Sequence, residues 1–260
     1  MIGAGVYYAH MLHGSHQVHV GHKRGIAHKK RLRRSWVVLA VILLPALILF
    51  ISGSVTGTSW SALGIALTTS FVHLFTGYSI SLVIGVTAAL LIGWSRYTNT
   101  FLPILDVLQN VPSFALIPIF HMIFGYSDLM IVIFVATTVI WPILFYTLSA
   151  VHGAREDLND AATVFGATGI KRLLHYLTPL SLPAIVTGSI VGMSIGWESV
   201  IGVEIIGNIG GIGTFLTRTD GTVPTATLTV GIIAILCLVF IINRLLWTPL
   251  LAGLSHYGNA

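Results

Sequence analysis

The sequence has very little charge. Asp, Glu, Lys and Arg together make up only 8% of its 260 residues, whereas about 25% is usual in soluble domains. Hydrophobic residues make up 55%, and the mean hydropathy is +0.92. A water-soluble protein needs charged side chains on its surface, and this chain has too few of them. Its composition therefore fits a protein that is surrounded by lipid. These values exclude an ordinary water-soluble domain and predict an integral membrane protein.

Cysteine and the common catalytic patterns are also scarce. The one cysteine, Cys237, lies in an apolar run, which excludes a disulfide framework within the chain and a thiolate metal site. The ATP-binding pattern G-x-x-x-x-G-K-[ST] and the zinc pattern H-E-x-x-H do not occur. His73 and His121 lie in or beside apolar runs, and no serine partner is evident for either. We therefore expect a chain that is not an enzyme and binds no cofactor itself.

Long apolar runs are what the sequence does have. A helix needs about 20 apolar residues to cross a bilayer. Six runs reach or approach that length, at residues 36–51, 63–94, 101–124, 129–151, 180–206 and 226–251. The third run contains Pro103, Pro112 and Pro118, which predicts a kinked or partly unwound helix. The pattern predicts an all-α membrane protein with about six transmembrane helices in residues 36–260.

The basic residues predict the orientation of these spans. Seven Lys and Arg residues precede the first run, and the loops that would share its side carry most of the others, namely Arg96, Arg155, Lys171, Arg172 and Arg244. The opposite side carries only Arg218. Lys and Arg collect on the cytoplasmic side of a membrane protein, so both termini are expected in the cytoplasm. Because the basic cluster directly precedes a span, the net charge of +5 indicates contact with lipid headgroups rather than with nucleic acid.

Residues 1–35 form a histidine-rich and basic tail, which we expect to be flexible and cytoplasmic. Histidines recur at every third position, at His10, His13, His16, His19 and His22. Closely spaced imidazoles can bind zinc, nickel or copper. No carboxylate or thiolate lies nearby to complete a site, so a plain polar tail is the alternative.

The most informative polar segment is the predicted cytoplasmic loop at about residues 152–179. Its acidic residues, Asp160 among them, suit the start of a short helix because the helix dipole favours acids there. Ala161 and Ala162 give that helix a thin face that another protein can approach closely. Gly166 and Gly169 permit a sharp turn. The loop is longer than a simple connection requires, so it is either a structured connector or a docking surface.

The same loop predicts a second short helix. Thr168 is positioned to cap its start. Pro179 and Pro183 are expected to end this helix and to begin the next span.

These residues resemble a known family. Asp160-Ala161-Ala162, then Gly166, then Pro179 is similar to the "EAA" loop of ABC-importer permeases, with Asp160 in place of the usual glutamate. The stretch PILDVLQNVP at 103–112, the pair Trp197 and Glu204, and Gly211-Ile212-Gly213 resemble the nitrate, sulfonate, taurine and bicarbonate type of that family. The resemblance covers about residues 77–251. The histidine-rich tail and Glu198 are not part of the family pattern.

The resemblance implies a fold and a set of partners. The fold would be that of a type I ABC-importer permease in the cell membrane. A second copy of the permease, a pair of ATPase subunits that bind ATP and magnesium, and an extracytoplasmic substrate-binding protein would complete the transporter. The ATPase would dock on the loop through Asp160, Ala161, Ala162, Gly166, Gly169 and Pro179. The family favours small oxyanions, sulfonates and similar molecules, and the scarcity of basic residues within the spans gives no independent reason to expect an anion.

Several polar or helix-breaking residues in the spans are candidates for the translocation path. They are Asp106, Gln109, Asn110, Pro112, Pro118, Trp197 and Glu204. An acid in a span is costly and usually faces a cavity or a partner. Glu198 and Glu204 project about 120° apart on a helix, so they are not expected to serve one site. For Glu204 a solvated position at the outer end of the helix is the alternative.

Two other classes of function remain open from the residues alone. The histidine-rich tail would suit a metal-ion transporter, although the spans carry no cluster of metal ligands. A membrane scaffold that transports nothing would have the same spans but no need for the loop around Asp160.

Overall fold

We analysed a computed structural model that describes residues 59–95, 97–154, 160, 162–217 and 225–254, together with residues 47, 50 and 54. The chain divides into two compact units, Met1–Ile51 and Ser52–Ala260, and the architecture below is that of the second. In its described part every regular element is helical. The histidine-rich tail lies outside the described residues, and so does nearly all of the predicted span at 36–51.

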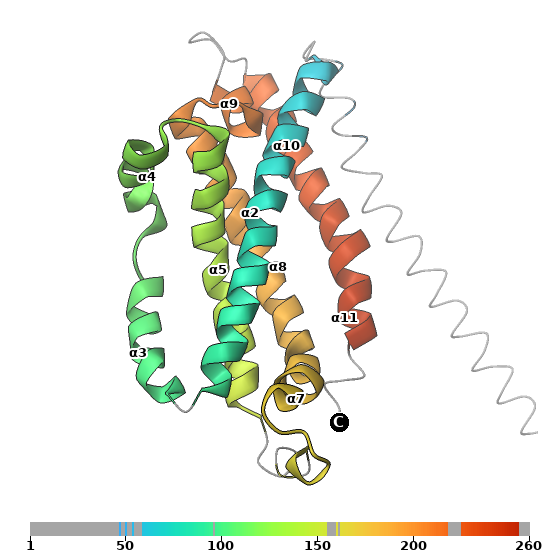
Figure 1. The fold of residues 1–260 in the computed structure, drawn as a ribbon. Helices are drawn as coiled ribbons and strands as arrows, with labels where there is room; N and C mark the ends of the chain where they lie inside the picture. Colours follow the sequence, from blue (N-terminus) through green and yellow to red (C-terminus); the bar gives the residue numbers. More distant parts are fainter. Residues whose placement is uncertain are drawn as a thin grey trace, which may run out of the picture. The chain divides into compact units, whose positions relative to one another are not determined.

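Four helical segments of the second unit are long and apolar enough to cross a bilayer, in good agreement with the predicted spans (Figure 1). The first is α2 (Trp60–Trp94) and the second is α5 (Asp128–His152). The third, Ile170–Gly207, combines α7 (Ile170–Arg172), η2 (Leu173–Leu177) and α8 (Thr178–Gly207). The fourth, Leu228–Leu254, lies within α10 (Thr225–Ile242), η3 (Asn243–Trp247) and α11 (Thr248–Leu254).

The predicted span at 101–124 is broken in the middle. It consists of α3 (Thr98–Gln109), the 3-10 turn η1 (Ser113–Leu116) and α4 (Ile117–Phe124), with a bend of 77° between the two halves. Pro112 lies at the break in an extended conformation (φ −61°, ψ 112°), and the residue before a proline is disfavoured in a helix. Pro118 lies in the first turn of α4, where a missing N–H costs nothing. The interruption is therefore confirmed, but Pro118 starts a helix rather than kinking one.

The core consists of α2, α5 and α8, and glycines hold these helices close together. Gly188, Gly192 and Gly196 recur every fourth residue on α8 and face α5 and α2. A side chain at Gly188 would lie only 2.9 Å from the carbonyl oxygen of Pro142 in α5. Membrane helices associate through such small residues because lipid gives no hydrophobic drive between them.

Two wide π-type turns let prolines occur within long helices. Each turn is followed by Thr-Pro, at Thr178-Pro179 after η2 and at Thr248-Pro249 after η3. The carbonyl oxygen of Leu173 accepts the backbone N–H of Thr178, as expected for a wide turn, and also the Thr178 hydroxyl at 2.8 Å. The helix therefore runs from residue 170 into the span, and the prediction that Pro179 and Pro183 end it is wrong.

Candidate functional site

A buried polar cluster joins three helices near the Gly207 end of α8. At its centre is Glu204 of α8, whose side chain has no solvent exposure. Ser70 Oγ of α2 lies 2.8 and 2.7 Å from the two carboxylate oxygens. His73 Nδ1 of α2 lies 3.1 Å from Oε1, and Gly213 N–H donates to Oε2 at 2.9 Å. A buried carboxylate is tolerated only when it is partnered in this way, so the alternative of a solvated Glu204 is wrong.

The short helix α9 (Gly211–Thr217) folds over this carboxylate. Gly211 has φ +84°, and a side chain there would collide with the Glu204 carboxylate, so only glycine fits at this position. The Ile212 N–H donates to Ser70 Oγ at 2.7 Å. The segment after α8 is thus more than a plain loop, because its backbone is hydrogen-bonded to Glu204 and its serine partner.

His73 extends the cluster to a second carboxylate at the start of α5. Its Nε2 lies 3.3 Å from Oδ1 of Asp128, whose side chain is 75% exposed. Both ring nitrogens therefore face carboxylate oxygens, and only the protonated ring can donate from both. The cluster thus connects α2, α5, α8 and α9, and the His73 ring lies between the two carboxylates.

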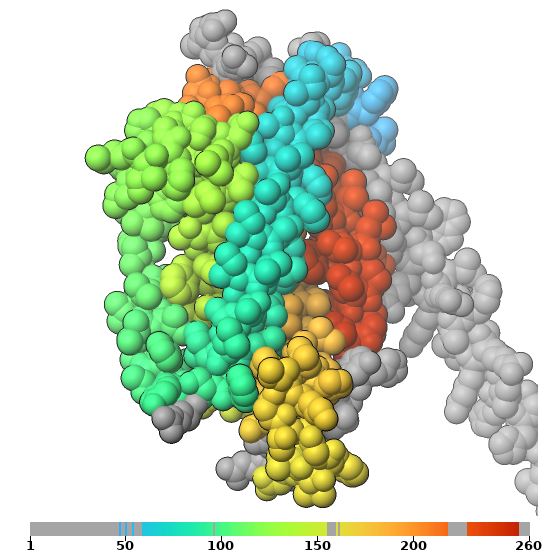
Figure 2. Space-filling view, viewed as in Figure 1, coloured from blue at the N-terminus to red at the C-terminus, as the bar shows by residue number. Residues whose placement is uncertain are grey.

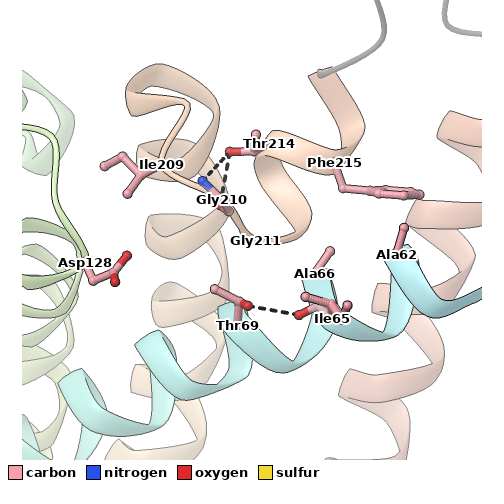
Figure 3. Close-up of a pocket in the computed structure, with 10 residues that line it drawn as sticks. All are labelled: Ala62, Ile65, Ala66, Thr69, Asp128, Ile209, Gly210, Gly211, Thr214 and Phe215. Atoms are coloured by element: carbon pink, nitrogen blue, oxygen red, sulfur yellow. Dashed lines mark hydrogen bonds between the residues drawn. The ribbon is translucent and has the colours of Figure 1, made fainter.

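A cavity of about 590 Å³ opens beside the cluster (Figure 3). It lies between the start of α2, Asp128 and the segment from Ile209 to Phe215. Asp128 projects from α5, while Thr69 donates to the backbone of its own helix at Ile65 (Figure 3). The Asp128 carboxylate therefore contacts both the buried histidine and the open cavity.

The loop between α5 and the Ile170–Gly207 segment presents a protruding apolar tip (yellow in Figure 2). Asp160 and residues 162–164 are helical, and the helix ends in a Schellman turn. The Ala167 N–H donates to the carbonyl of Ala162 at 2.9 Å, and the Gly166 N–H donates to that of Thr163 at 3.0 Å. Gly166 has φ +81°, which the turn requires.

The tip itself is made by Val164 and Phe165, whose side chains are 84% and 89% exposed. Ala162 is half-buried and Ala161 lies outside the described residues. Gly169, at φ +56°, precedes the next helix, and no side chain caps that helix, so the predicted Thr168 cap is wrong. Exposed large apolar side chains on a polar loop mark an interaction surface, and sequence reasoning found the loop but missed these two residues.

The family can now be assigned. Residues 81–246 match the family described as "Binding-protein-dependent transport system inner membrane component", and this stretch is more than half of the chain. The chain belongs to this family. The predicted family membership and membrane location are confirmed.

Curated relatives in this family transport several small solutes. The chain is 31% identical over 142 residues to the bicarbonate transport system permease protein CmpB of Synechococcus elongatus, covering 54% of this chain and 51% of the relative. It is 27% identical over 161 residues to the nitrate import permease NrtB of the same species, covering 62% and 57%. The taurine permease TauC of Escherichia coli is 24% identical over 192 residues, covering 74% and 68%. The chain matches about half the length of the first two relatives.

A solved structure gives the same fold. A chain of the MetNI methionine ABC transporter, in inward-facing conformations, matches with a TM-score of 0.66 at 16% identity, covering 76% of this chain and all of that one. The predicted all-α permease fold is confirmed, while the cytoplasmic position of the termini stays a prediction.

The other predicted path residues of this family member fall into two groups. Asp106, Gln109 and Asn110 are exposed at the end of α3, where the Gln109 amide donates to the Asp106 carboxylate at 3.1 Å. Trp197 is buried, and its indole N–H has no hydrogen-bond partner among the described residues. The structure thus does not bring the predicted residues together at one point. Their role in a path remains a proposal.

Sequence reasoning missed most of the polar cluster around Glu204. Ser70, His73 and Asp128 are more than 70 residues away from Glu204 along the chain, and no short pattern links them. The letters G-x-S-x-G do occur at Gly192–Gly196, but they lie within α8 instead of at a strand-to-helix turn. The Ser194 hydroxyl donates to its own helix at the Ile190 carbonyl, so this string has no nucleophile geometry.

Proposed function

We propose that the chain is the membrane-spanning permease subunit of an ATP-driven importer for a small solute. Family membership supports this reading, since the family is described as the inner-membrane component of binding-protein-dependent transport. In this role the chain catalyses no reaction. ATP and magnesium would be bound by a separate pair of ATPase subunits, and an extracytoplasmic binding protein would deliver the solute to a pair of permeases.

The observation that carries the proposal is the apolar tip at Val164 and Phe165. It protrudes from a loop that lies between two spans, and the Schellman turn at Gly166 fixes its shape. A lipid-facing role does not explain it, because it follows the charged run 155–160 on the side predicted to be cytoplasmic. Exposed aromatic residues on a rigid turn are the usual anchors of a protein interface, and an ATPase groove is the partner that the family membership supplies.

Co-purification tests this proposal directly. The full chain, extracted from its native membrane in mild detergent, is expected to retain an ATPase subunit. Phe165→Ala should lower the recovered ATPase about tenfold or more, because loss of an aromatic anchor costs about 2 kcal/mol. Leu236→Ala is the matched control, since Leu236 is also an exposed apolar residue (62%) but lies on α10. Absence of any ATPase from the wild-type preparation would contradict the proposal and favour a membrane scaffold.

The metal-transporter alternative gains no support from the described residues. Among them, no group of three or more His, Cys, Asp or Glu side chains could hold an ion. The small solutes named for the relatives, bicarbonate, nitrate and taurine, make a small polar molecule the expected substrate.

A further inference from the structure

Glu198 is an exposed acid within a transmembrane helix. It lies nine residues before the end of α8 at Gly207, which corresponds to about 14 Å along the helix axis. Its side chain is exposed, although its neighbours Trp197 and Ser199 are buried. In the part of the chain that the structure describes, no hydrogen bond or ion pair reaches its carboxylate. An ionised group at this depth is tolerated when it faces a water-filled cavity or another protein chain.

The face of α8 around Glu198 carries both polar and apolar residues. At 100° per residue, the residues that project within about 40° of Glu198 are Leu180, Ala184, Thr187, Val191, Ser194, Gly202 and Ile205. The hydroxyls of Thr187 and Ser194 donate to carbonyl oxygens of their own helix at 2.9 and 3.2 Å. Glu198 is therefore the one charged group on this face of α8.

The broken third span passes beside this face of α8. Phe114 of η1 packs against Gly202, one helical turn from Glu198 toward Gly207, and leaves no room for a side chain there. The non-helical residues between α3 and η1 are exposed, and Asn110 donates to the Asp106 backbone carbonyl at 2.5 Å. Backbone without helical hydrogen bonds occurs at membrane depth only where it is buried in protein or lines an aqueous cavity, and broken helices form the solute sites of many transporters. Two independent features of the same region thus point to an aqueous path.

We propose that Glu198 lines the translocation path and selects a solute without net negative charge. The inference rests on the proposed importer function and narrows its substrate class to cations and neutral molecules. The acidic side chain of the broken span, Asp106, is also exposed, whereas the described Lys and Arg residues, Lys171, Arg172 and Arg244, lie outside α3, α4 and α8. A fixed negative charge in a narrow path repels anions and attracts cations, and the effect is largest where protein or lipid excludes bulk water.

The test measures the electrostatic potential beside Glu198 without requiring a known substrate. Cys237→Ser removes the one native thiol, and Ser194→Cys places a new thiol one turn from Glu198. The variant is reconstituted in vesicles with its ATPase. It is then treated with a cationic trimethylammonium methanethiosulfonate and with its anionic sulfonate counterpart. The cationic reagent is expected to react faster, and Glu198→Gln should lower the cation-to-anion rate ratio about tenfold.

Three outcomes would overturn the inference. Failure of the Ser194→Cys thiol to react with either reagent, while a control thiol at the exposed position Asn99 in α3 (Asn99→Cys) reacts with both, would place this face in lipid or protein. An unchanged rate ratio after Glu198→Gln would remove the charge-selecting role. Binding-protein-dependent nitrate uptake that is equally fast in the wild type and in Glu198→Gln would contradict the assigned substrate class. Any of these results in a complex that hydrolyses ATP would leave the proposed importer function intact, whereas absence of an ATPase from the wild-type preparation would contradict the importer function itself.

Discussion

The two acidic residues of α8, on different faces of the helix, differ in burial. On one face Glu204 is completely buried, and a serine, a histidine and a backbone N–H surround its carboxylate. On the other face Glu198, six residues earlier, is exposed with no described partner. Gly188, Gly192 and Gly196 lie where α8 packs against α5 and α2, whereas Ser194 is exposed like Glu198. The comparison shows that an acid in a membrane helix can either be part of the packing or remain exposed. The predictions below test the assignment of these roles.

The largest effect is expected from Glu204→Ala. This change leaves Ser70, His73 and the Gly213 N–H without their common acceptor in a buried site, and removal of one partner of a buried charged pair costs about 3–5 kcal/mol. Thermal unfolding in detergent should show a correspondingly large loss of stability. Wild-type stability of this variant would mean that the carboxylate does not hold α9 in place.

A smaller loss is expected from Gly188→Ala, where α8 packs against α5. The added methyl group would lie 2.9 Å from the Pro142 carbonyl oxygen and 3.1 Å from Ile143 Cα, and backbone atoms cannot rotate away. Overpacking of this kind costs about 2 kcal/mol. The matched control is Ser194→Ala on the exposed face, which removes one atom and should leave unfolding unchanged. An equal effect of the two substitutions would show that the α5–α8 contact is looser than described.

The substitution Ser70→Ala tests the cluster from the side of α2. It removes the hydroxyl that contacts both carboxylate oxygens and accepts from the Ile212 N–H. A buried polar group that loses its partner costs about 1.5 kcal/mol. Combined with Glu204→Ala in a double-mutant cycle, the two losses should be clearly non-additive, because both act on one interaction. Strict additivity would contradict a direct hydrogen bond.

The smallest effect on stability is expected from Glu198→Gln. Its side chain is exposed, so the free energy of unfolding should change by less than about 0.5 kcal/mol. The variant should differ from the wild type in the charge preference of the path and in little else. A loss of stability as large as that of Glu204→Ala would mean that Glu198 has a buried partner in the assembled transporter.

The loop at about residues 152–179 shows which local features a sequence pattern can predict and which it cannot. Gly166 and Gly169 do take positive φ angles, as a turn-forming pair should. The tip residues Val164 and Phe165 were missed because an apolar residue next to a glycine is as easily read as core, and only the accessible surface shows that it protrudes. The continuation of the helix through Pro179 was missed for a different reason. The wide turn η2 that accommodates Pro179 depends on the backbone geometry of Leu173–Leu177, and the composition of these five residues does not distinguish them.

The sequence by itself determined the class of the protein, five of its six predicted spans and its family. Each of these depends on composition and on patterns within about 25 neighbouring residues. Such patterns are easy to recognise because a segment that crosses the bilayer core must be apolar. Only the tertiary structure decided which acid is buried, because the hydroxyl and imidazole that surround Glu204 come from α2 and the backbone N–H from α9. It also decided that Glu198 stays exposed, since the faces of α8 differ in which helices pack against them. Contacts between distant segments depend on how whole helices pack, and that information is spread over the chain instead of being written in any one stretch of it.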